Sequence, residues 1–529
     1  MKNSIYKILL IGVFTFFFTG CNEYLEEELH SSFGNGNFPT ESNVETLLNH
    51  THGEIGKFIM LANWMFWATE FPTPSAQYRY RQNHERSNLS GWNWGTTRTD
   101  PAYFDLMEWM WDAIRPANEI IAKVPDIEME DTKRQAEIIG EAKFIRAMCY
   151  FYAVRLWGGM PIIDIPQGLS DDLFPKRATI AETYDFIVKD LKDAAEVLPT
   201  RSEYIARGIP LGHITKGAAK GTLATAYITM AGEALGDDSH LAEAKTLLEE
   251  IINSGEYALV GVGTPDPYEV LWDWQNDNNE EFLYTIQKEG GAQNYRGIFG
   301  YFTPQHATSG IWTSGDGDKF AKGVGLDGIP PEFVEWYASH DSGPRFKWTI
   351  ISEYVLQEDI TGFNAGDTLR YNASPEAQGH IGKYRAKGAP LTDNFGNPGN
   401  FPVLRYADIL LLHSEVSNEL DAPDYTGVNA TRERAGLPPL SGLSKDEFRD
   451  AVFLERDLEL TYEQKMLFDM RRRGLEYTKS KLIGFYNPTQ NNYPRSFDIQ
   501  DIEPHRMLYP YPPRELQSNP NLEQNPGYQ

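Results

Sequence analysis

Cysteine is scarce in this chain, which has only Cys21 and Cys149 among its 529 residues. Two cysteines cannot form the disulfide framework of a small secreted domain. The histidines are scattered and include no His-Glu-x-x-His pair, so the sequence has no zinc motif of that kind. A Gly-x-Ser-x-Gly elbow, a phosphate-binding loop and a dinucleotide fingerprint are also absent from the sequence. The common hydrolases and nucleotide-dependent enzymes therefore receive no support.

Basic residues are few relative to acidic ones, with 48 Lys and Arg against 75 Asp and Glu and a net charge of −27. Binding to a phosphate backbone needs a positively charged surface, so this composition excludes nucleic acid as a ligand. It argues equally against polyanionic glycans. Long apolar runs are lacking too, and none after residue 18 is long enough to cross a bilayer. The chain is nevertheless long enough to bury a large core.

The start of the chain has the form of a secretory signal. Lys2 and Lys7 form a positive region, and residues 8–18 form an apolar region that is too short to span a membrane. Thr19-Gly20-Cys21 resembles a bacterial lipobox, in which the cysteine becomes the lipidated first residue of the mature chain. We therefore expect a signal peptide at residues 1–20 and a lipid on Cys21. The alternative is a chance cysteine beside an ordinary signal.

The residues after Cys21 suit a tether. Acids crowd the stretch "CNEYLEEELHSS", and Ser, Gly and Asn follow, a composition that stays solvated between a membrane and a domain. We expect residues 21–40 to be a lipidated acidic tether and residues 41–529 to form a single domain. With Cys21 lipidated, Cys149 has no disulfide partner, and we expect it to be a buried small apolar side chain.

Helical periodicity marks two parts of the chain, at about 41–256 and 403–475. Within 144–156 apolar residues occupy two helix faces, which indicates a helix sandwiched between others, and Gly158, Gly159 and Pro161 end it. Small residues at 218–226 suit close contacts between antiparallel helices, as in tetratricopeptide-type hairpins. Ser444 and Glu447 have the spacing of a capping box. The sequence thus predicts a mainly α fold with a helix-hairpin scaffold.

Between the helical parts lies a region rich in Gly, Pro, Asn and Asp, at about 257–402, and the chain ends in a Pro- and Asn-rich tail at 476–529. A long irregular region inside a globular chain usually carries function rather than core. We therefore expect residues 257–402 to be a loop-rich region that carries the ligand site.

Two polar, helix-free stretches contain grouped aromatic residues, "QYRYRQNHERSNLSGWNWGTTR" and "GAQNYRGIFGYFTPQHATSGIWTSGDG". Exposed aromatic rings stack on the apolar faces of sugars, and neighbouring Asn and Arg supply hydrogen bonds to hydroxyls. The candidate ligand-binding residues are Tyr78, Arg79, Trp92, Asn93, Trp94, Tyr295, Arg296 and Trp312. The alternative is that they pin long loops to the scaffold. Core packing is expected for Trp64, Trp67, Trp109, Trp111 and Trp272.

Two acidic patterns suggest other chemistry. Glu455, Glu459 and Glu463 are spaced for one helix face, and glycoside hydrolysis requires a pair of carboxylates. Like charges one turn apart more often lie on a solvated face or pair with nearby bases such as Arg456. Residues 314–320, "SGDGDKF", hint at a calcium loop, but Phe320 stands at a ligand position. No catalytic residue and no cofactor are predicted, and a structural calcium ion stays open without named ligands.

Five stretches together resemble the SusD/RagB family of outer-membrane nutrient-binding lipoproteins. They are Cys21 with the acids after it, "AKFIRAMCYFYAVRLWGGMPII", "LRYADILLLHSEVSNEL" with "NATRERAGLP", "LERDLELTYEQKMLFDMRRRG" and the terminal "YPYPPRELQSNPNLEQNPGYQ". They occur in the family's order and span most of the mature chain. The resemblance implies a mostly α fold of tetratricopeptide-type hairpins, overlaid by an irregular region that bears the ligand site.

The resemblance also implies capture without catalysis. The protein would face the cell exterior, held in the outer membrane by the lipid on Cys21. It would pass oligosaccharides or polysaccharides to a SusC-like TonB-dependent transporter. The alternatives are peptide capture, as in some relatives, a surface glycoside hydrolase, and a helical scaffold that binds only protein. The region 257–402 matches the family too weakly for ligand residues to be transferred.

Overall fold

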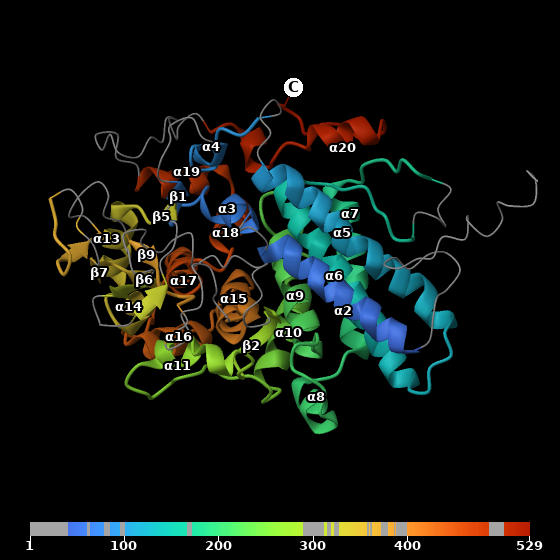
Figure 1. Cartoon of the computed structure of the whole chain (residues 1–529), viewed down its shortest axis with the longest axis horizontal. Coiled ribbons are helices and arrows are strands. Elements are labelled where there is room, and N and C mark those ends of the chain that lie inside the picture. Colours follow the sequence, from blue (N-terminus) through green and yellow to red (C-terminus); the bar gives the residue numbers. More distant parts are fainter. Residues whose placement is uncertain are drawn as a thin grey trace, which may run out of the picture.

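The computed structural model describes residues 41–60, 64–78, 85–95, 101–166, 172–288, 311–314, 319–321, 327–356, 359, 362–371, 379–385, 387, 399–485 and 502–528 (Figure 1). The signal peptide, Cys21 and the tether lie outside these ranges, as do Arg79, Tyr295 and Arg296. Residues 315–318 of the calcium-loop segment lie outside them as well. These sequence-based expectations therefore stay predictions.

Helices dominate the described residues, as the sequence predicts. Before residue 256 they are α2 (Glu41–Met60), α3 (Trp64–Glu70), α4 (Glu85–Ser90), α5 (Pro101–Lys123), α6 (Thr132–Trp157), α7 (Ile180–Val197), α8 (Arg201–Arg207), α9 (Lys216–Met230) and α10 (Leu241–Ile252). After it come α11 (Pro267–Leu271), α13 (Pro331–His340), α14 (Pro344–Thr349), α15 (Tyr406–Glu419), α16 (Thr426–Ala435), α17 (Lys445–Glu459), α18 (Met466–Arg472), α19 (Leu475–Ile483) and α20 (Pro513–Ser518). The described part of the region 257–402 thus contains the helices α11, α13 and α14, and the tail at 476–529 begins inside α19.

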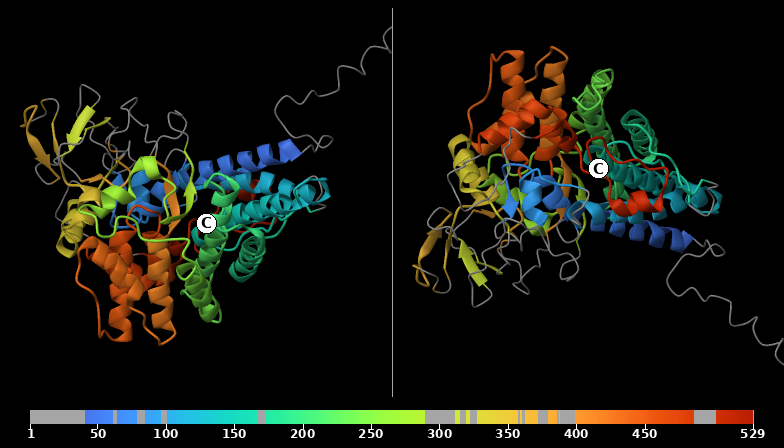
Figure 2. Two further views of the ribbon diagram at one scale, coloured as in Figure 1. Left: turned by 90° about the horizontal axis from the view of Figure 1, so that it is seen from below. Right: turned by 90° about the horizontal axis from the view of Figure 1, so that it is seen from above.

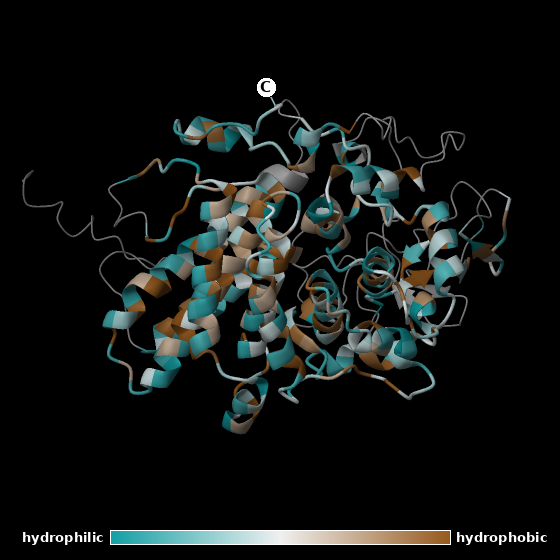
Figure 3. Ribbon diagram, turned by 180° about the vertical axis from the view of Figure 1, so that it is seen from behind, coloured by the Kyte–Doolittle hydropathy of each residue, from teal (hydrophilic) through white to brown (hydrophobic). Residues whose placement is uncertain are grey.

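Successive long helices pack side by side. Contacts join α2 to α5, α5 to α6, α6 to α7, α7 to α9, α9 to α10 and α10 to α15. Figure 1 shows α2, α5 and α6 as neighbouring rods on the right, and Figure 3 shows apolar residues gathered between the helices and hydrophilic ones on their outer turns. Small residues permit the close approach, since a Cβ added at Gly221 of α9 would lie 2.8 Å from Ile409 of α15. This arrangement confirms the helix-hairpin scaffold.

Helix α6 is the centre of the scaffold and is buried on both predicted faces. Cys149 is fully buried within it, as expected. The helix ends where the sequence predicts, because Gly158 has a left-handed φ of 83° that other residues rarely adopt. A Cβ on Gly159 would lie 2.0 Å from the carbonyl oxygen of Ala178, so only glycine fits there. The capping box of Ser444 and Glu447 at the start of α17 is confirmed as well.

The strands form four small antiparallel sheets. They pair β1 (Gln77–Tyr78) with β5 (Asp327–Gly328), β2 (Phe282–Ile286) with β10 (Phe401–Arg405), and β6 (Ile350–Ile351) with β9 (His380–Ile381). The fourth sheet has the order β4 (Lys319–Ala321), β3 (Ile311–Ser314), β7 (Glu353–Val355), β8 (Thr368–Arg370). Figure 2 shows its strands at one edge of the molecule, away from α2, α5 and α6.

The pair β2–β10 closes the loop-rich region at its base. Phe401 is opposite Ile286, so the chain leaves the scaffold after β2 and returns to it at β10 beside its point of departure. The segment 287–400 is therefore an excursion from the helical scaffold, whose two ends are held together by main-chain hydrogen bonds.

A buried ionic cluster joins this excursion to the C-terminal helices. Its members are the acids Glu281, Asp341, Glu455, Glu459 and Glu463 and the bases Arg345, Lys383, Arg405 and Arg434. None is more than 4% exposed. Arg432, at the edge of the cluster, donates a hydrogen bond of 3.2 Å to Glu455. With this fifth base, the numbers of acidic and basic side chains are equal.

Glu459, the last residue of α17, lies at the middle of the ionic cluster. Its carboxylate accepts hydrogen bonds from Arg434 at 2.8 Å, Arg345 at 3.0 Å and the Tyr268 hydroxyl at 2.7 Å, and Arg405 lies 2.7 Å away. Burial alone would raise the pKa of Glu459, but the guanidinium groups of Arg434, Arg405 and Arg345 outweigh it and lower that pKa below its ordinary value. The carboxylate is therefore ionised and fully engaged.

The environment of the three glutamates corrects one sequence-based expectation. They do not lie on a solvated face, and the nearby Arg456 pairs instead with Asp408 at 2.7 Å and Asp469 at 2.8 Å. The basic partners of the glutamates come from residues 345–434, which only the packing of the folded chain brings to them. Helix α17 also ends at Glu459, so Glu463 lies in the turn beyond it. The three buried and paired carboxylates therefore have a structural role.

We predict that Glu459→Ala destabilises the protein by about 3–5 kcal/mol, because it leaves buried guanidinium groups without their partner. Thermal unfolding and urea denaturation would measure the loss. The matched control is Glu476→Ala on α19, whose side chain is 87% exposed and 3.5 Å from Lys479. Its midpoint should stay close to that of the wild type. Equal midpoints for the two variants would contradict the structural role of the ionic cluster.

Candidate ligand-binding site

The described part of the predicted site is formed by β1, by α4 and by the turn after α4, near the top of Figure 1. Tyr78 lies on β1, opposite Asp327 of β5, and is half-buried. Helix α4 packs against β1 and α3, so the stretch 77–98, expected to be free of helix, contains a short one. Tyr78 and the turn at residues 91–95 therefore share one part of the molecule.

Trp92 and Trp94 occupy the turn after α4, and both are buried with 2% exposure. The Trp92 indole donates to the carbonyl oxygen of Pro72 at 2.8 Å, and the Trp94 indole donates to the hydroxyl of Tyr528 at 2.7 Å. The ring centroids of Trp92 and Trp94 lie 4.9 Å apart, and Tyr509 meets Trp94 edge-on at 4.7 Å. The Trp92 indole thus fastens the turn to the segment after α3, the Trp94 indole fastens it to the C-terminal tail, and neither ring presents a face to a ligand.

Asn93, between these two tryptophans, is exposed. Arg506 from the tail donates to its side-chain oxygen at 3.5 Å and also to the main-chain oxygen of Trp92. Trp92 has a φ of 53°, a left-handed conformation that is uncommon for a tryptophan. The strained turn and the packed indoles together hold Asn93 at the surface.

Next to Tyr78 lies a polar group that the sequence analysis did not single out. Arg86 of α4 stacks 3.6 Å from the ring centroid of Trp67 and 5.4 Å from that of Tyr78. The Trp67 indole donates to the carboxyl of Asp327 at 2.7 Å. Burial raises the pKa of Asp327 to about 7, although Arg86 and the Trp67 hydrogen bond act to lower it. These residues lie far apart in sequence, so periodicity gave no sign of the contact.

Trp312 lies on β3, opposite Phe320 of β4, in the four-stranded sheet at the edge of the molecule (Figure 2). Its backbone is described and its side chain is not, so its part in a ligand site stays a prediction. Of the candidate residues, Tyr78 on β1 and Trp92, Asn93 and Trp94 in the turn after α4 therefore lie in one part of the molecule, and Trp312 lies in a separate sheet.

Of the five tryptophans expected in the core, Trp67 is buried and the other four are half-buried at its edge. Trp67 is 2% exposed, and Trp64 stacks on Trp109 with 4.5 Å between ring centroids. Trp111 and Trp272 are half-buried and pack against the main apolar core. Apolar neighbours along the chain therefore predicted contact with the core for all five, and full burial for Trp67 only.

Within the part of the chain that the structure describes, no helix combines the length and the apolar character needed to cross a membrane.

Comparison with known proteins gives consistent matches. A family model described as the SusD family matches residues 268–528, and one described as starch-binding and associating with the outer membrane matches residues 23–228. SusD-like protein P2 of Formosa agariphila is 29% identical over 449 residues, 78% of this chain and 78% of that protein. A SusD-like protein of Bacteroides ovatus is 25% identical over 386 residues, 69% of this chain and 64% of that protein. The crystal structure of a SusD superfamily protein from Parabacteroides distasonis superposes with a TM-score of 0.74 at 26% identity, over 93% of this chain and 100% of that one.

Asp327 gives the candidate site a pH dependence. Its pKa rises from an ordinary 3.8 to about 7 on folding, so the folded state holds this proton more tightly than the unfolded state. The resulting stabilisation is complete below about pH 4 and is lost as the pH rises through about 7. Asp327→Asn keeps an oxygen for the Trp67 indole and cannot ionise. We predict that it is more stable than the wild type at pH 8, by up to about 4 kcal/mol, which is the equivalent of about three pKa units.

Thermal midpoints of the wild type and Asp327→Asn between pH 5 and pH 8 would test this prediction. The midpoint of the wild type should fall more steeply with pH. A smaller slope remains in the variant, because burial also raises the pKa of Glu70 to about 7. Parallel curves for the two proteins would show that Asp327 does not bind a proton on folding.

Proposed function

The chain belongs to the SusD-like family of outer-membrane-associated, glycan-binding proteins, and from this membership we propose a cell-surface lipoprotein that captures oligosaccharides or polysaccharides. It delivers them to a SusC-like TonB-dependent transporter and does not cleave them. The observation that carries the proposal is the match of the two family models to residues 23–228 and 268–528, together with the superposition on a SusD superfamily fold.

The arrangement of the chain supports this role. The helical scaffold is closed by β2–β10, and Arg345 and Lys383 anchor the excursion between these strands, so its loops can carry ligand contacts without disturbing the helix pairs. Part of the candidate ligand stretches belongs to this excursion, including Tyr295, Arg296 and Trp312. The other part, Tyr78 and Asn93 with Arg79, belongs to β1 and the segments around α4. We propose that these residues contact the ligand, and that Trp92 and Trp94 support them from beneath.

We propose no catalysis because the three acids whose spacing suggested glycoside hydrolysis are unsuited to it. Glu455, Glu459 and Glu463 are buried and paired with arginine and lysine in the ionic cluster. A glycosidase needs one carboxyl that is free to donate a proton and a second that faces the sugar. These three glutamates meet neither requirement.

Affinity electrophoresis of the mature chain on neutral polysaccharides, with starch among them, and on acidic ones would test ligand capture. We predict retardation by a neutral glycan and a loss of affinity of about tenfold or more in Trp312→Ala, since an aromatic anchor contributes at least ~1.4 kcal/mol. Trp92→Ala should instead lower the thermal midpoint, because it removes a buried side chain. Trp274→Ala is the matched control, since it follows α11 at the opposite end of the molecule from α4 (Figure 1).

Each other outcome of this experiment has a defined meaning. Retardation that persists in Trp312→Ala would place the site elsewhere. A protein that no glycan retards would favour capture of peptides or of another protein. New reducing ends after incubation would contradict the non-catalytic role.

Lipid attachment is tested separately. We predict that Cys21→Ser moves the protein from the outer-membrane fraction to the soluble fraction, because no other membrane anchor is expected. Cell fractionation with detection by antibody, and incorporation of labelled fatty acid, would measure the change. Retention of the variant in the membrane, with undiminished labelling, would rule out Cys21 as the lipid site.

A further inference from the structure

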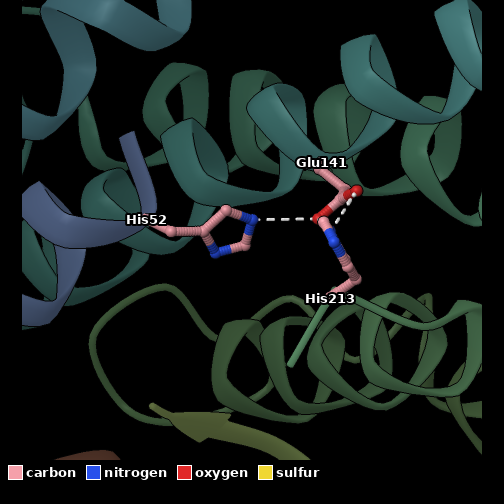
Figure 4. A group of neighbouring side chains, drawn as sticks. All are labelled: His52, Glu141 and His213. Atoms are coloured by element: carbon pink, nitrogen blue, oxygen red, sulfur yellow. Dashed lines mark hydrogen bonds and ion pairs between the residues drawn. The ribbon is translucent and has the colours of Figure 1, made fainter. Parts of the chain in front are cut away.

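Two histidines and a glutamate meet where three elements of the scaffold come together (Figure 4). His52 of α2 lies 2.9 Å from the carboxylate of Glu141 in α6, measured from Nε2. His213, in the segment between α8 and α9, lies 3.0 Å from both oxygens of the same carboxylate, measured from Nδ1. Ligand atoms from the three side chains all lie within 4.8 Å of one another. We propose that these residues bind one divalent transition-metal ion, such as Zn²⁺.

The carboxylate of Glu141 is preset in its orientation. It is fully buried, and it accepts a hydrogen bond from Arg134 at 3.0 Å and one from the main-chain N–H of Ile214 at 3.3 Å. These donors fix the orientation of the carboxylate independently of the two imidazoles. Such support of a ligand by outer hydrogen bonds is typical of metal sites in proteins.

The two imidazoles stand between this carboxylate and the solvent. The side chains of His52 and His213 are 21% and 18% exposed, which gives an ion a path to the site and leaves room for water as a further ligand. Bond lengths of about 2.0–2.1 Å to Zn²⁺ set ligand atoms about 3.3 Å apart in a tetrahedral site. The hydrogen-bonded distances of 2.9 and 3.0 Å are close to this spacing. When an ion binds, each neutral imidazole keeps its proton on the other ring nitrogen, Nδ1 of His52 and Nε2 of His213, so that Nε2 of His52 and Nδ1 of His213 can act as ligands.

The charges around the site suit a divalent cation. Glu45, Glu137 and Glu141 face Arg134 and Arg207, so the group carries one negative charge when the imidazoles are neutral. Arg134 is a competing cation, but Glu45 engages it through two contacts of 2.7 and 2.9 Å. A divalent metal ion raises the charge of the group to plus one. Two imidazoles with one carboxylate favour zinc, cobalt, nickel or copper over calcium or magnesium.

The ion would fasten the first described helix to the rest of the scaffold. Helix α2 already packs on α5 and α6, and the metal adds a bond between α2, α6 and the segment that leads into α9. Because a ligand that binds only the folded state stabilises it, the thermal midpoint should rise with metal concentration. Sequence motifs do not reveal such a site, since its ligands come from distant positions.

Titration with Co²⁺ tests the proposal directly. The protein is the mature chain without an affinity tag, stripped of metal with a chelator, and Cys21→Ser is present throughout so that no exposed thiol competes. We expect one equivalent of Co²⁺ to bind with visible d–d absorption, Zn²⁺ to displace it, and either ion to raise the thermal midpoint. An absence of the absorption band together with an unchanged midpoint would overturn the proposal and leave a hydrogen-bonded triad.

Three variants give the test its specificity. His52→Gln and His213→Gln retain polar side chains of similar size and should bind Co²⁺ at least about tenfold more weakly. His50→Gln is the matched control, since its side chain lies two residues away on the same helix and is 55% exposed. Circular dichroism without metal verifies that each variant folds. Equal affinity in all variants, or an equal loss in His50→Gln, would show that the ion binds surface histidines and would refute the site. Glycan binding is measured independently of these outcomes.

Discussion

The position of the loop-rich region depends on the ionic cluster at Glu459. Three arginines reach this carboxylate from different elements, Arg345 from α14, Arg405 from the end of β10 and Arg434 from α16. A buried charge that loses its partner costs several kcal/mol, so none of these elements can shift without the others. The cluster fixes β10, and β10 fixes β2. The excursion between them therefore starts from a rigid base, although its own segments include few long elements.

Local patterns were sufficient for the scaffold. Helix α6 has two buried faces because apolar residues occupy both, and it ends at Gly158 because that residue adopts a left-handed φ. The capping box at Ser444 follows from a spacing of three residues. Such features depend on neighbours within one or two turns, and a sequence contains them completely. The mainly α fold class could therefore be predicted from the order of the residues alone.

The candidate site could be predicted only in part, because its environment comes from distant segments. Trp92 and Trp94 stand in a polar stretch, which suggests exposure, but Trp94 bonds to Tyr528, 434 positions further along the chain. The C-terminal tail that packs on Trp94 is far from it in sequence, so no local pattern could predict this burial. The same holds for His52 and Glu141, which are 89 positions apart, and for the glutamates of α17, whose arginine partners follow no helical spacing. In each case the residue type indicated a possible role, but the partner that the residue contacts could not be predicted from the sequence.

The pairing of Phe401 with Ile286 has a consequence for how proteins of this architecture diverge. Because a sheet holds both ends of the segment 287–400, the entropy of closing it grows only slowly with length, by about 0.6 kcal/mol for each doubling. Insertions and deletions in its loops therefore leave the folding of the helix pairs nearly unchanged, provided that Arg345, Lys383 and the buried apolar residues of the segment keep their contacts. A lineage can vary these loops in size and chemistry, and diversify what it recognises, while the anchoring residues preserve the stability of the molecule.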